Sequence, residues 1–229
     1  MTANVVDIEN AAYGYGDRLL LSEMSLSLAP GTFHFLTGPS GAGKTTFLKL
    51  CYLDLMPSGG GFKIFGRDVQ GMGRDDIARA RRRIGVVHQD CRFLDHLSVV
   101  ENVSMPLDVA GRARGEATAD LGELMRWVGL EHRTDAFPPE LSGGERQRLA
   151  LARAVIMSPD LILADEPTGN VDWEMSERLL SLLIELNRMG KTIVVATHDL
   201  PLIRSAKAQV PARVIRLKGG HIHLAGSEL

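Results

Sequence analysis

Residues 38–46, GPSGAGKTT, carry the spacing Gly-x-x-x-x-Gly-Lys-Thr directly after the apolar run at residues 33–36. A strand, a glycine loop and a helix start in this order form a cradle for the phosphates of a nucleotide. Glycine adopts backbone conformations that a Cβ excludes, so successive N–H groups can turn toward phosphate oxygens at a helix N-terminus. The predicted phosphate-binding residues are Gly38, Pro39, Ser40, Gly41, Ala42, Gly43, Lys44, Thr45 and Thr46.

The last residues of this phosphate loop are expected to have separate roles. Lys44 would meet the β- and γ-phosphates, and the Thr45 hydroxyl would meet a magnesium ion. The alternative is an ordinary glycine turn followed by a helix. Since glycine makes up about 7% of residues in proteins, this spacing would arise by accident in roughly one chain of this length in a hundred. The sequence therefore favours nucleotide binding.

The bulk composition excludes several classes of protein. Hydrophobic residues make up 45% and charged residues 24% of the 229-residue chain, which is unlike a disordered or fibrous protein. A net charge of -2 gives no reason to expect a nucleic-acid partner. Cys51 and Cys91 lack the spacing of a zinc site or a disulfide framework, which favours the cytosol. The first ten residues do not resemble a signal peptide and no apolar run approaches the length of a membrane span, so membrane contact would need a partner.

Short apolar or β-branched runs recur along the chain and predict strands. They alternate with helix-length amphipathic segments, which is typical of a mostly parallel α/β sheet. One such segment, residues 174–188, places apolar and charged side chains on opposite faces of a helix. The predicted strands are residues 5–8, 32–36, 84–87, 161–164, 192–196 and 214–217.

Between Gln89 and Pro159 the β-type runs stop, and a helical pattern punctuated by proline and glycine takes over. We therefore expect a helical insertion at about residues 90–158. Each candidate motif occurs once, which predicts a single nucleotide site per chain.

Two carboxylates end the predicted strand at residues 161–164. Since α/β proteins bind ligands at the carboxyl ends of their strands, Asp165 and Glu166 are expected at the ligand edge of the sheet. There Asp165 would hold magnesium through water, while Glu166 would orient and activate the attacking water. An acidic pair at a solvated turn is common and means little alone, but its combination with the phosphate loop favours catalysis.

Two more polar side chains, His198 and Gln89, each follow a predicted strand and so end on the same edge. Asp199 before Pro201 resembles a helix start, so His198 has the alternative interpretation of a neighbour of a helix cap. Gln89 alone would carry no functional meaning.

A second glycine-rich segment, LSGGE at residues 141–145, precedes the helical run at residues 146–156. Ser142 and Glu145 have the spacing of a capping box, so helix initiation alone could explain them. Two adjacent glycines exceed what initiation needs, and they expose backbone N–H groups at the positive end of a helix. The LSGGE segment therefore predicts a second phosphate contact.

The phrases LSGGERQR, LILADEPTGNVD and ATHD, which follow one another between residues 141 and 199, resemble the ATP-binding-cassette (ABC) ATPases. The resemblance covers about residues 15–199, nearly the whole chain. It implies one α/β domain over residues 1–229, with a P-loop NTPase core of the ABC type and a mostly parallel sheet. It also implies an N-terminal antiparallel β part, and a helical subdomain at about residues 90–158 inserted in the RecA-like core.

The resemblance also implies roles by position. Tyr15 would stack on adenine, and Tyr13 stays open as an alternative because the local spacing is one residue short of the commoner pattern. Gln89 would sense the γ-phosphate and magnesium, and His198 would hold the γ-phosphate. The implied catalytic residues are Lys44, Gln89, Glu166 and His198, and the implied metal-binding residues are Thr45, Gln89 and Asp165.

The resemblance further implies a head-to-tail homodimer with two ATP molecules and magnesium at its interface. The residues that would contact the partner's ATP are Ser142, Gly143, Gly144 and Glu145. Asn170 and Asp172 would also cross the interface. His88, before the glutamine, and Trp173, just beyond Asp172, depart from the family pattern, and neither removes a group that the chemistry needs.

Within the family, the phrases FLTGPSGAGK and PTGNVD resemble the bacterial cell-division ATPases. LolD-type lipoprotein-releasing ATPases and MacB-type ATPases share the second phrase and stay as alternatives. A cell-division role implies an integral membrane partner, a place on the cytoplasmic side of the inner membrane, and a conformational signal that activates peptidoglycan hydrolases. ABC ATPases of translation or DNA repair carry two cassettes or a long coiled coil, and a sensor without hydrolysis would lack Glu166.

Two segments bear on partner surfaces. Residues 74–83 form the densest charge cluster, for which a solvated helix face is favoured over acidic lipid or nucleic acid because acidic residues are interleaved. In ABC ATPases, residues 90–97 correspond to the place where the helical insertion meets a short helix of the membrane subunit. Phe93 and Leu94 are the expected anchors there, and burial in the insertion is the alternative.

Overall fold

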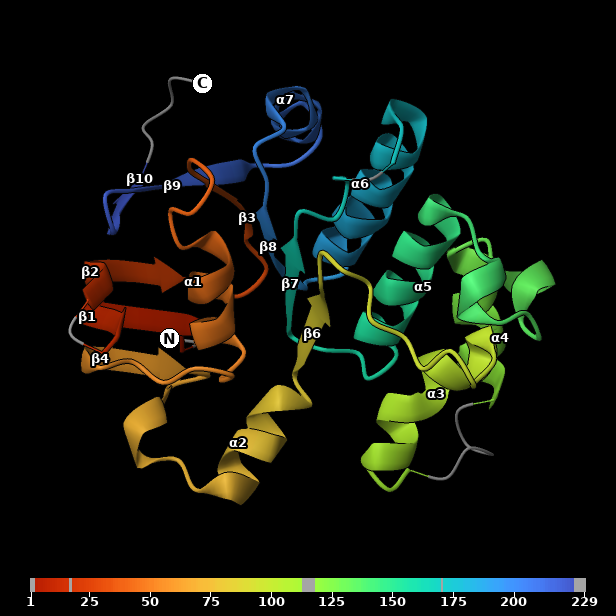
Figure 1. The fold of residues 1–229 in the computed structure, drawn as a ribbon, viewed down its shortest axis with the longest axis horizontal. Helices are drawn as coiled ribbons and strands as arrows, with labels where there is room; N and C mark the ends of the chain where they lie inside the picture. Colours follow the sequence, from red (N-terminus) through yellow and green to blue (C-terminus); the bar gives the residue numbers. More distant parts are fainter. Residues whose placement is uncertain (1–2, 17, 113–117, 170, 225–229) are drawn as a thin grey trace.

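The computed structural model describes residues 3–16, 18–112, 118–169 and 171–224, which fold into two sheets and their covering helices (Figure 1). The smaller sheet contains β1 (Val6–Tyr15), β2 (Arg18–Leu28), β4 (Gly59–Ile64) and β5 (Arg67–Asp68). It is antiparallel, in the order β2-β1-β4-β5. The larger sheet contains β3 (Phe33–Thr37), β6 (Ile84–Val87), β7 (Leu161–Asp165), β8 (Thr192–Ala196), β9 (Ala212–Lys218) and β10 (His221–Leu224). Its order is β10-β9-β3-β8-β7-β6, and all neighbours pair in parallel except β9 and β10.

The helices connect and cover these strands. The α-helices are α1 (Lys44–Cys51), α2 (Arg74–Arg81), α3 (Val99–Val109), α4 (Thr118–Trp127), α5 (Gly143–Val155), α6 (Trp173–Arg188) and α7 (Leu200–Lys207). Short 3-10 helices are η1 (Val69–Gly71), η3 (Glu131–Arg133) and η4 (Pro138–Glu140). Within the described residues, no helix combines the length and the apolar character needed to cross a membrane.

Strand β7 shows why the larger sheet is parallel and covered on both faces. Its side chains alternate, so Leu161 and Leu163 face a cluster shared with the antiparallel sheet, whereas Ile162 and Ala164 face a cluster shared with helices. All four are buried, and a strand with no polar face is stable only inside a covered sheet. The carboxyl ends of β3, β6, β7 and β8 meet at one edge, the upper one in Figure 1.

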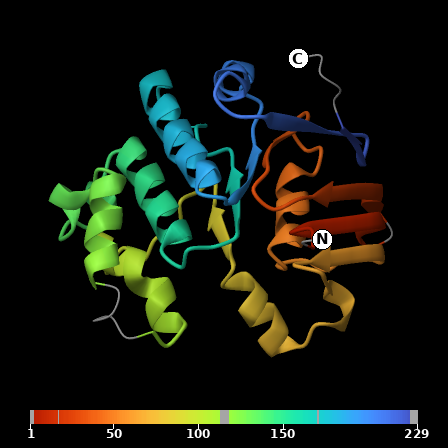
Figure 2. The ribbon, with the colours of Figure 1, turned by 180° about the vertical axis from the view of Figure 1, so that it is seen from behind.

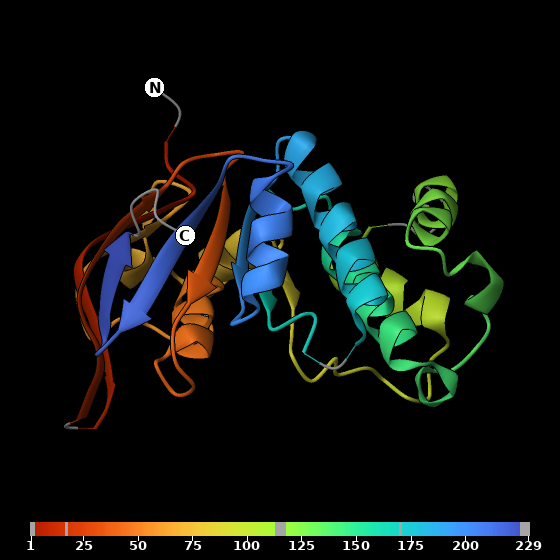
Figure 3. The same cartoon turned by 90° about the horizontal axis from the view of Figure 1, so that it is seen from above.

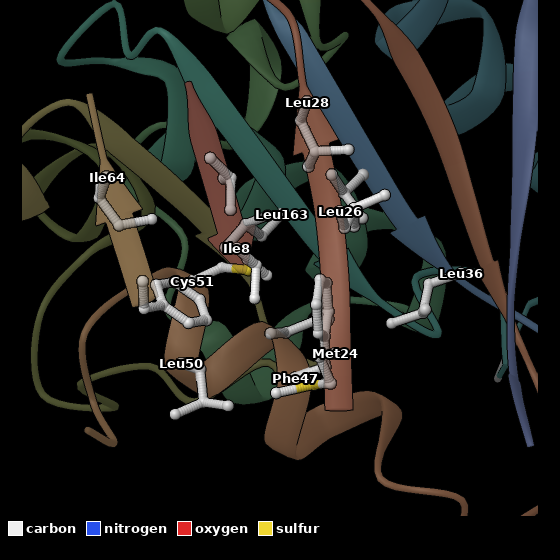
Figure 4. Packing of buried hydrophobic residues seen from close by; sticks show 14 of the residues in the cluster. Ile8, Met24, Leu26, Leu28, Leu36, Phe47, Leu50, Cys51, Ile64 and Leu163 are labelled. Carbon is white, nitrogen blue, oxygen red and sulfur yellow. The ribbon is translucent and has the colours of Figure 1, made fainter. Parts of the chain in front are cut away.

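The first cluster fills the space between the antiparallel sheet, α1 and one face of the larger sheet (Figure 4). In Figure 4, Phe47, Leu50 and Cys51 of α1 lie in one cluster with Ile8 of β1 and Met24 of β2. Full burial of one such side chain contributes roughly 1.5–3 kcal/mol. The packing of α1 therefore fixes the position of the phosphate loop that precedes it.

Helix α6 covers the opposite face of the larger sheet, beside α5 and α7 (Figures 2 and 3). Leu179, Leu183 and Leu186 are buried there. Glu174 and Arg178 are exposed on the other face and form an ion pair of 2.6 Å. This confirms the amphipathic helix that the sequence predicts for this segment.

Between β6 and β7 the described secondary structure is helical. Helices α3, α4 and α5 share a third cluster that includes Val103, Met125 and Leu149. Ser98 begins α3 with a capping box to Glu101. These helices lie in the predicted insertion at about residues 90–158, and the division into a core and a subdomain stays a prediction.

The strands β6 and β8 have the predicted bounds, and β3, β7 and β9 differ from theirs by one or two residues, whereas β1 continues from the predicted end at residue 8 to Tyr15. The sequence runs did not reveal β2 or β4. In β2, Met24 and Leu26 are buried while Ser25 is exposed, which is the alternation of a strand with one wet face. Most charged side chains of α2 are exposed, and Asp76 on it pairs with Arg67 at 2.7 Å and with Arg79 at 2.6 Å; the solvated face stays a prediction.

Candidate functional site

A pocket of about 400 Å3 lies at the carboxyl edge of the larger sheet, beside the start of α1. It brings together residues from the phosphate loop and from the ends of three other strands. The predicted site residues that line it are Ser40, Gly41, Gly43, Lys44, Thr45, Thr46, Gln89, Asp165, Glu166 and His198. Its lining also includes Leu20 and Gly169, which the sequence did not single out.

The phosphate loop ends at α1, whose N-cap is Gly43. Gly43 has φ 100°, a left-handed conformation, and a Cβ there would lie 2.9 Å from Cδ2 of Leu21. Both the conformation and the space therefore favour glycine. Among the described residues, no side chain caps α1. Because the first N–H groups of a helix have no partner within it, this helix start suits an anion such as phosphate.

Lys44 and His198 converge on Glu166. Lys44 Nζ lies 3.8 Å from Glu166 Oε1 and donates to the carbonyl oxygens of Gly38 at 3.0 Å and Pro39 at 3.5 Å. His198 Nδ1 lies 3.1 Å from both carboxylate oxygens of Glu166. The side chain of Glu166 is 12% exposed and that of His198 is 78% exposed. A shielded carboxylate is thus held between an ammonium group and an imidazole that solvent reaches.

The backbone of Glu166 is also unusual. Its φ of 44° is left-handed, which is uncommon for a residue with a side chain. Its N–H donates to the carbonyl oxygen of Ala196 at 2.8 Å, which ties this turn to the end of β8. Strain of this kind costs on the order of 1–3 kcal/mol and persists where the surroundings fix a side chain in place.

Asp165 has the properties of a metal ligand. Its Oδ1 is buried and has no hydrogen-bond partner among the described residues. Burial raises the pKa of this carboxyl above its usual range and the charge of Glu166 adds to the rise, while a hydrogen bond with Thr45 opposes it. A buried carboxylate oxygen without a partner is costly unless a cation or water satisfies it. Thr45 and Gln89 line the same pocket, so the predicted metal-binding residues lie together.

The two candidate adenine-stacking residues differ in exposure. Tyr13 is buried, whereas Tyr15 is 59% exposed, and the two rings meet edge to face with centroids 5.2 Å apart. Only Tyr15 has a broad free surface, which favours it over Tyr13. Tyr15 itself is outside the lining of the pocket, in which Leu20 of the neighbouring strand takes part.

The LSGGE segment leads into the start of α5, and none of its five residues, 141–145, is part of the pocket lining. Its capping box is complete: Ser142 Oγ accepts from Glu145 N at 3.3 Å, and Glu145 Oε2 accepts from Ser142 N at 2.8 Å. Arg133 Nε donates to Glu145 Oε1 at 2.9 Å. Burial would raise the pKa of Glu145, but the hydrogen bonds from Ser142 and Arg133 outweigh it and lower the pKa to about 2.

The remaining predicted residues have local structural roles. Asp172 caps α6 by accepting from Met175 N at 2.8 Å, and Asn170 lies outside the described residues. Asp199 caps α7 by accepting from Leu202 N at 3.0 Å. His198 therefore both neighbours a helix cap and lines the pocket, so its two interpretations are compatible.

Phe93 and Leu94 have different surroundings. Phe93 packs against the second and third clusters, and the guanidinium groups of Arg146 and Arg153 lie 5.2 Å and 4.8 Å from its ring centroid. Leu94 is 40% exposed. The ring of Phe93 is partly buried in the packing of the helical segment, which favours the alternative of burial, and its role as a surface anchor stays a prediction.

Comparison with known proteins agrees with this arrangement. The ABC transporter family model matches residues 21–169. This chain belongs to the ABC transporter family. It is 40% identical over 192 residues to the cell division ATP-binding protein FtsE of Bacillus subtilis, covering 84% of each chain. It is 39% identical over 220 residues to FtsE of Escherichia coli, covering 96% of this chain and 97% of the relative.

Solved ABC structures have the same fold. The dimeric post-hydrolysis structure of the ATP-binding cassette MJ0796, bound to ADP and Pi, matches with a TM-score of 0.84 at 33% identity, covering 95% of this chain and 96% of that one. The structure of cbiO1 from Clostridium perfringens, part of the ABC transporter complex cbiONQ, matches with a TM-score of 0.86 at 26% identity, covering 98% and 88%. The predicted fold class is confirmed, and the chain is an ABC-type ATPase that binds ATP.

Proposed function

We propose that two copies of this ABC ATPase bind two ATP molecules head to tail and hydrolyse them. The observation that carries this proposal is the division of the site within one chain. The pocket holds the phosphate loop and the strand-end groups, while residues 142–145 of the same chain lie outside it. A second copy would supply its LSGGE segment to the open side of the pocket. The dimeric form of the related MJ0796 cassette supports this arrangement.

Each polar residue of the pocket has a role in this proposal. Lys44 binds the β- and γ-phosphates and stabilises the charge that develops on the transferred group. Glu166 accepts the proton of the attacking water on a carboxylate oxygen. His198, 3.1 Å from that carboxylate, orients it and donates to the γ-phosphate. The ion pair between Lys44 and Glu166 loosens when phosphate competes for the ammonium group.

Thr45, Gln89 and Asp165 would hold Mg2+, which neutralises negative charge on the β- and γ-phosphates when it is bound. The unpartnered Oδ1 of Asp165 supports this assignment. At the other end of the nucleotide, the free ring of Tyr15 would stack on adenine. Leu20 would close the same side with an apolar contact.

A second hollow supports a membrane partner. A groove of about 480 Å3 lies between α2, β6, α3 and α5. Its lining includes Arg81, Arg82, His88, Met105, Val109, Arg153 and Met157. Val109 is 77% exposed, so an apolar group inserted there would gain burial. His88 lines the groove and the adjacent Gln89 lines the pocket, so docking and ATP occupancy would affect each other reciprocally.

The partner we propose is an integral membrane protein resembling FtsX, because FtsE proteins match this chain over nearly its full length. The chain would lie on the cytoplasmic side of the bacterial inner membrane, held there by its partner. ATP-driven dimer formation would pass a conformational signal across the membrane that activates peptidoglycan hydrolysis. The alternative is the ATPase of a LolD-like or MacB-like transporter, in which the same cycle would move a substrate.

The test uses the Glu166→Gln chain, which should bind ATP and stall, as a tagged bait in native membranes with Mg-ATP. Mass spectrometry of crosslinked partners should identify an FtsX-like membrane protein. Val109→Arg on this background should lose that partner, while Met189→Arg, at a similarly exposed position outside the groove, should keep it. Recovery of a lipoprotein-releasing subunit would favour the alternative, and recovery of no membrane protein would contradict both.

A further inference from the structure

Trp173 is an exposed aromatic residue that the proposed chemistry does not use. It is the first residue of α6, and 47% of its surface is exposed. Asp172 caps the helix, so the start of α6 is well defined and Trp173 has a fixed place. A tryptophan side chain buries 150–250 Å2 when it is covered, roughly the largest gain available to a single residue. Its exposure in the free chain therefore favours a contact.

The start of α6 touches the start of α5. A Cβ on Gly144 would lie 2.7 Å from Cε of Met175, which is in the first turn of α6. Figure 1 shows both helices starting on the side of the molecule where the strands end. The first turn of α6, which begins at Trp173, therefore lies on the same side of the molecule as the LSGGE segment, which the second copy is proposed to approach.

The membrane partner is a poorer candidate for covering Trp173. The proposed docking groove includes Ala154 and Met157, at the end of α5, whereas Trp173 lies near its beginning. Helix α5 has 13 residues, which corresponds to a length of about 20 Å. A second copy of this chain that approaches the LSGGE segment could contact Trp173 without spanning the length of α5.

We infer that Trp173 is an anchor of the ATP-dependent dimer, buried against the second copy when two Mg-ATP-bound chains associate. The inference rests on the proposed function, since it names a residue of the interface proposed there. Tryptophan is enriched among residues that dominate interfaces, where its truncation costs a large share of the binding energy. The residue would thus set how tightly the two copies associate without touching the reacting atoms.

The chain offers a direct test, because Trp127 and Trp173 are its only tryptophans. On the Glu166→Gln background, Trp127→Phe leaves Trp173 as the single reporter, and Trp173→Phe leaves Trp127. Fluorescence and acrylamide quenching are recorded with ADP and with Mg-ATP, and size-exclusion chromatography reports dimer formation. Trp173 should shift to the blue and become several-fold harder to quench with Mg-ATP, while Trp127 should change little.

A second variant measures the energetic effect. Trp173→Ala should weaken ATP-dependent dimer formation by roughly tenfold or more. ATP binding by the monomer and the melting temperature should stay unchanged, because alanine supports a helix start and Asp172 still caps it. Met189→Ala is the matched control, since Met189 is 70% exposed at the other end of the same helix.

The outcomes separate the inference from the proposed function. If Mg-ATP produces a dimer in which Trp173 is quenched as readily as in the monomer, the inference is wrong and the proposed dimer stands. If the Glu166→Gln chain forms no dimer with saturating Mg-ATP, the proposed function fails and the inference fails with it. If Trp173→Ala does not fold, the quenching of the Trp127→Phe chain still shows whether Trp173 becomes buried in the dimer.

Discussion

The starts of α1 and α5 are both rich in glycine, but their backbone N–H groups differ in whether a side chain caps them. Helix α1 begins after Gly43 with no side-chain cap among the described residues. Helix α5 begins after Ser142 with a complete capping box, and Glu145 in that box also pairs with Arg133. An uncapped helix start keeps free donors for a ligand, whereas a capped start is already stable without one.

This difference indicates which of the two helix starts would bind ATP within its own chain. Residues at the start of α1 line a pocket that also contains Asp165 and Glu166, and in the proposed function this half binds the phosphates. The start of α5 is a preformed surface outside that pocket; its capping box already uses the N–H group of Glu145, and the N–H groups of Gly143 and Gly144 would be offered to a ligand. Variants at α1 should therefore act on one chain alone, whereas variants at α5 should act only through a second chain.

The largest expected effects are at the pocket. Lys44→Ala should bind ATP weakly, because it removes the cation that meets the phosphates. Glu166→Gln should bind ATP and lower hydrolysis by roughly 10²–10³-fold, because it removes the proton acceptor and keeps the shape. Calorimetric ATP titration beside phosphate release separates the two. A Glu166→Gln chain that binds ATP as weakly as Lys44→Ala would contradict the separate roles.

Mixing two inactive chains tests whether the two helix starts belong to different copies. Lys44→Ala and Ser142→Arg should each abolish hydrolysis alone. In their heterodimer both defects fall on one site, so the other site is intact. Equal mixing should restore roughly a quarter of wild-type activity, since half of the dimers are mixed and each has one working site of two.

Mixtures that stay inactive at every ratio would leave two explanations, which a second measurement separates. Either one chain completes its own site, or the two sites work only together. A cysteine crosslink between the phosphate loop of one chain and the LSGGE segment of the other would form only in the second case. Ser142→Arg alone should still bind ATP as a monomer, unlike Lys44→Ala.

The sequence predicted the pocket better than the sheet that frames it. Strand ends carry Gln89, Asp165 and His198 to one edge because parallel strands share a direction, and that follows from pattern alone. Leu20 was missed because β2 was not recognised as a strand, and its pocket contact depends on how the two sheets pack. Strand β4 was not predicted because it begins with glycines, which have no side chain to show the alternation of apolar and polar residues typical of a strand.

Two contacts could not be predicted from the sequence and required the three-dimensional structure. The position of Phe93 under Arg146 and Arg153 comes from tertiary packing, which spacing along the chain does not encode. The hydrogen-bonded ion pair between Arg133 and Glu145 joins a 3-10 helix to the LSGGE segment across 12 positions, and no sequence motif predicts it. The capping box within that segment, in contrast, follows from the local sequence and is confirmed.

A moderate effect is expected from Glu145→Gln, which keeps the capping box but removes the charge that pairs with Arg133. The pKa of Glu145 is lowered to about 2 from its usual 4.5, so its contribution to stability is present above pH 4.5 and is lost as pH falls toward 2. Between pH 6 and pH 3 the melting temperature of wild type should therefore fall further than that of Glu145→Gln, by roughly a few degrees.

The matched control for this pH dependence is Glu174→Gln. Glu174 also pairs with an arginine, but its side chain is 77% exposed, so the pair should add little to stability. Its melting curve should follow wild type at every pH. Equal behaviour of the two variants would mean that the LSGGE cap gains nothing from the buried charge.

The smallest expected effect is at Tyr15, which is proposed to belong to the half of the site that acts within one chain. Tyr15→Ala should weaken ATP binding by roughly five- to tenfold, because a base stacked on an aromatic ring gains about 1 kcal/mol or more. Tyr15→Phe keeps the ring and should match wild type, and Tyr13→Phe should too, since Tyr13 is buried. Calorimetry on the monomer at low protein concentration makes this measurement.

The loss of affinity should already appear in the monomer, before any dimer forms, whereas Ser142→Arg should show no loss under the same conditions. If Tyr15→Ala weakens binding only when dimers form, adenine recognition would belong to the interface, and the division between the two helix starts would need to be redrawn.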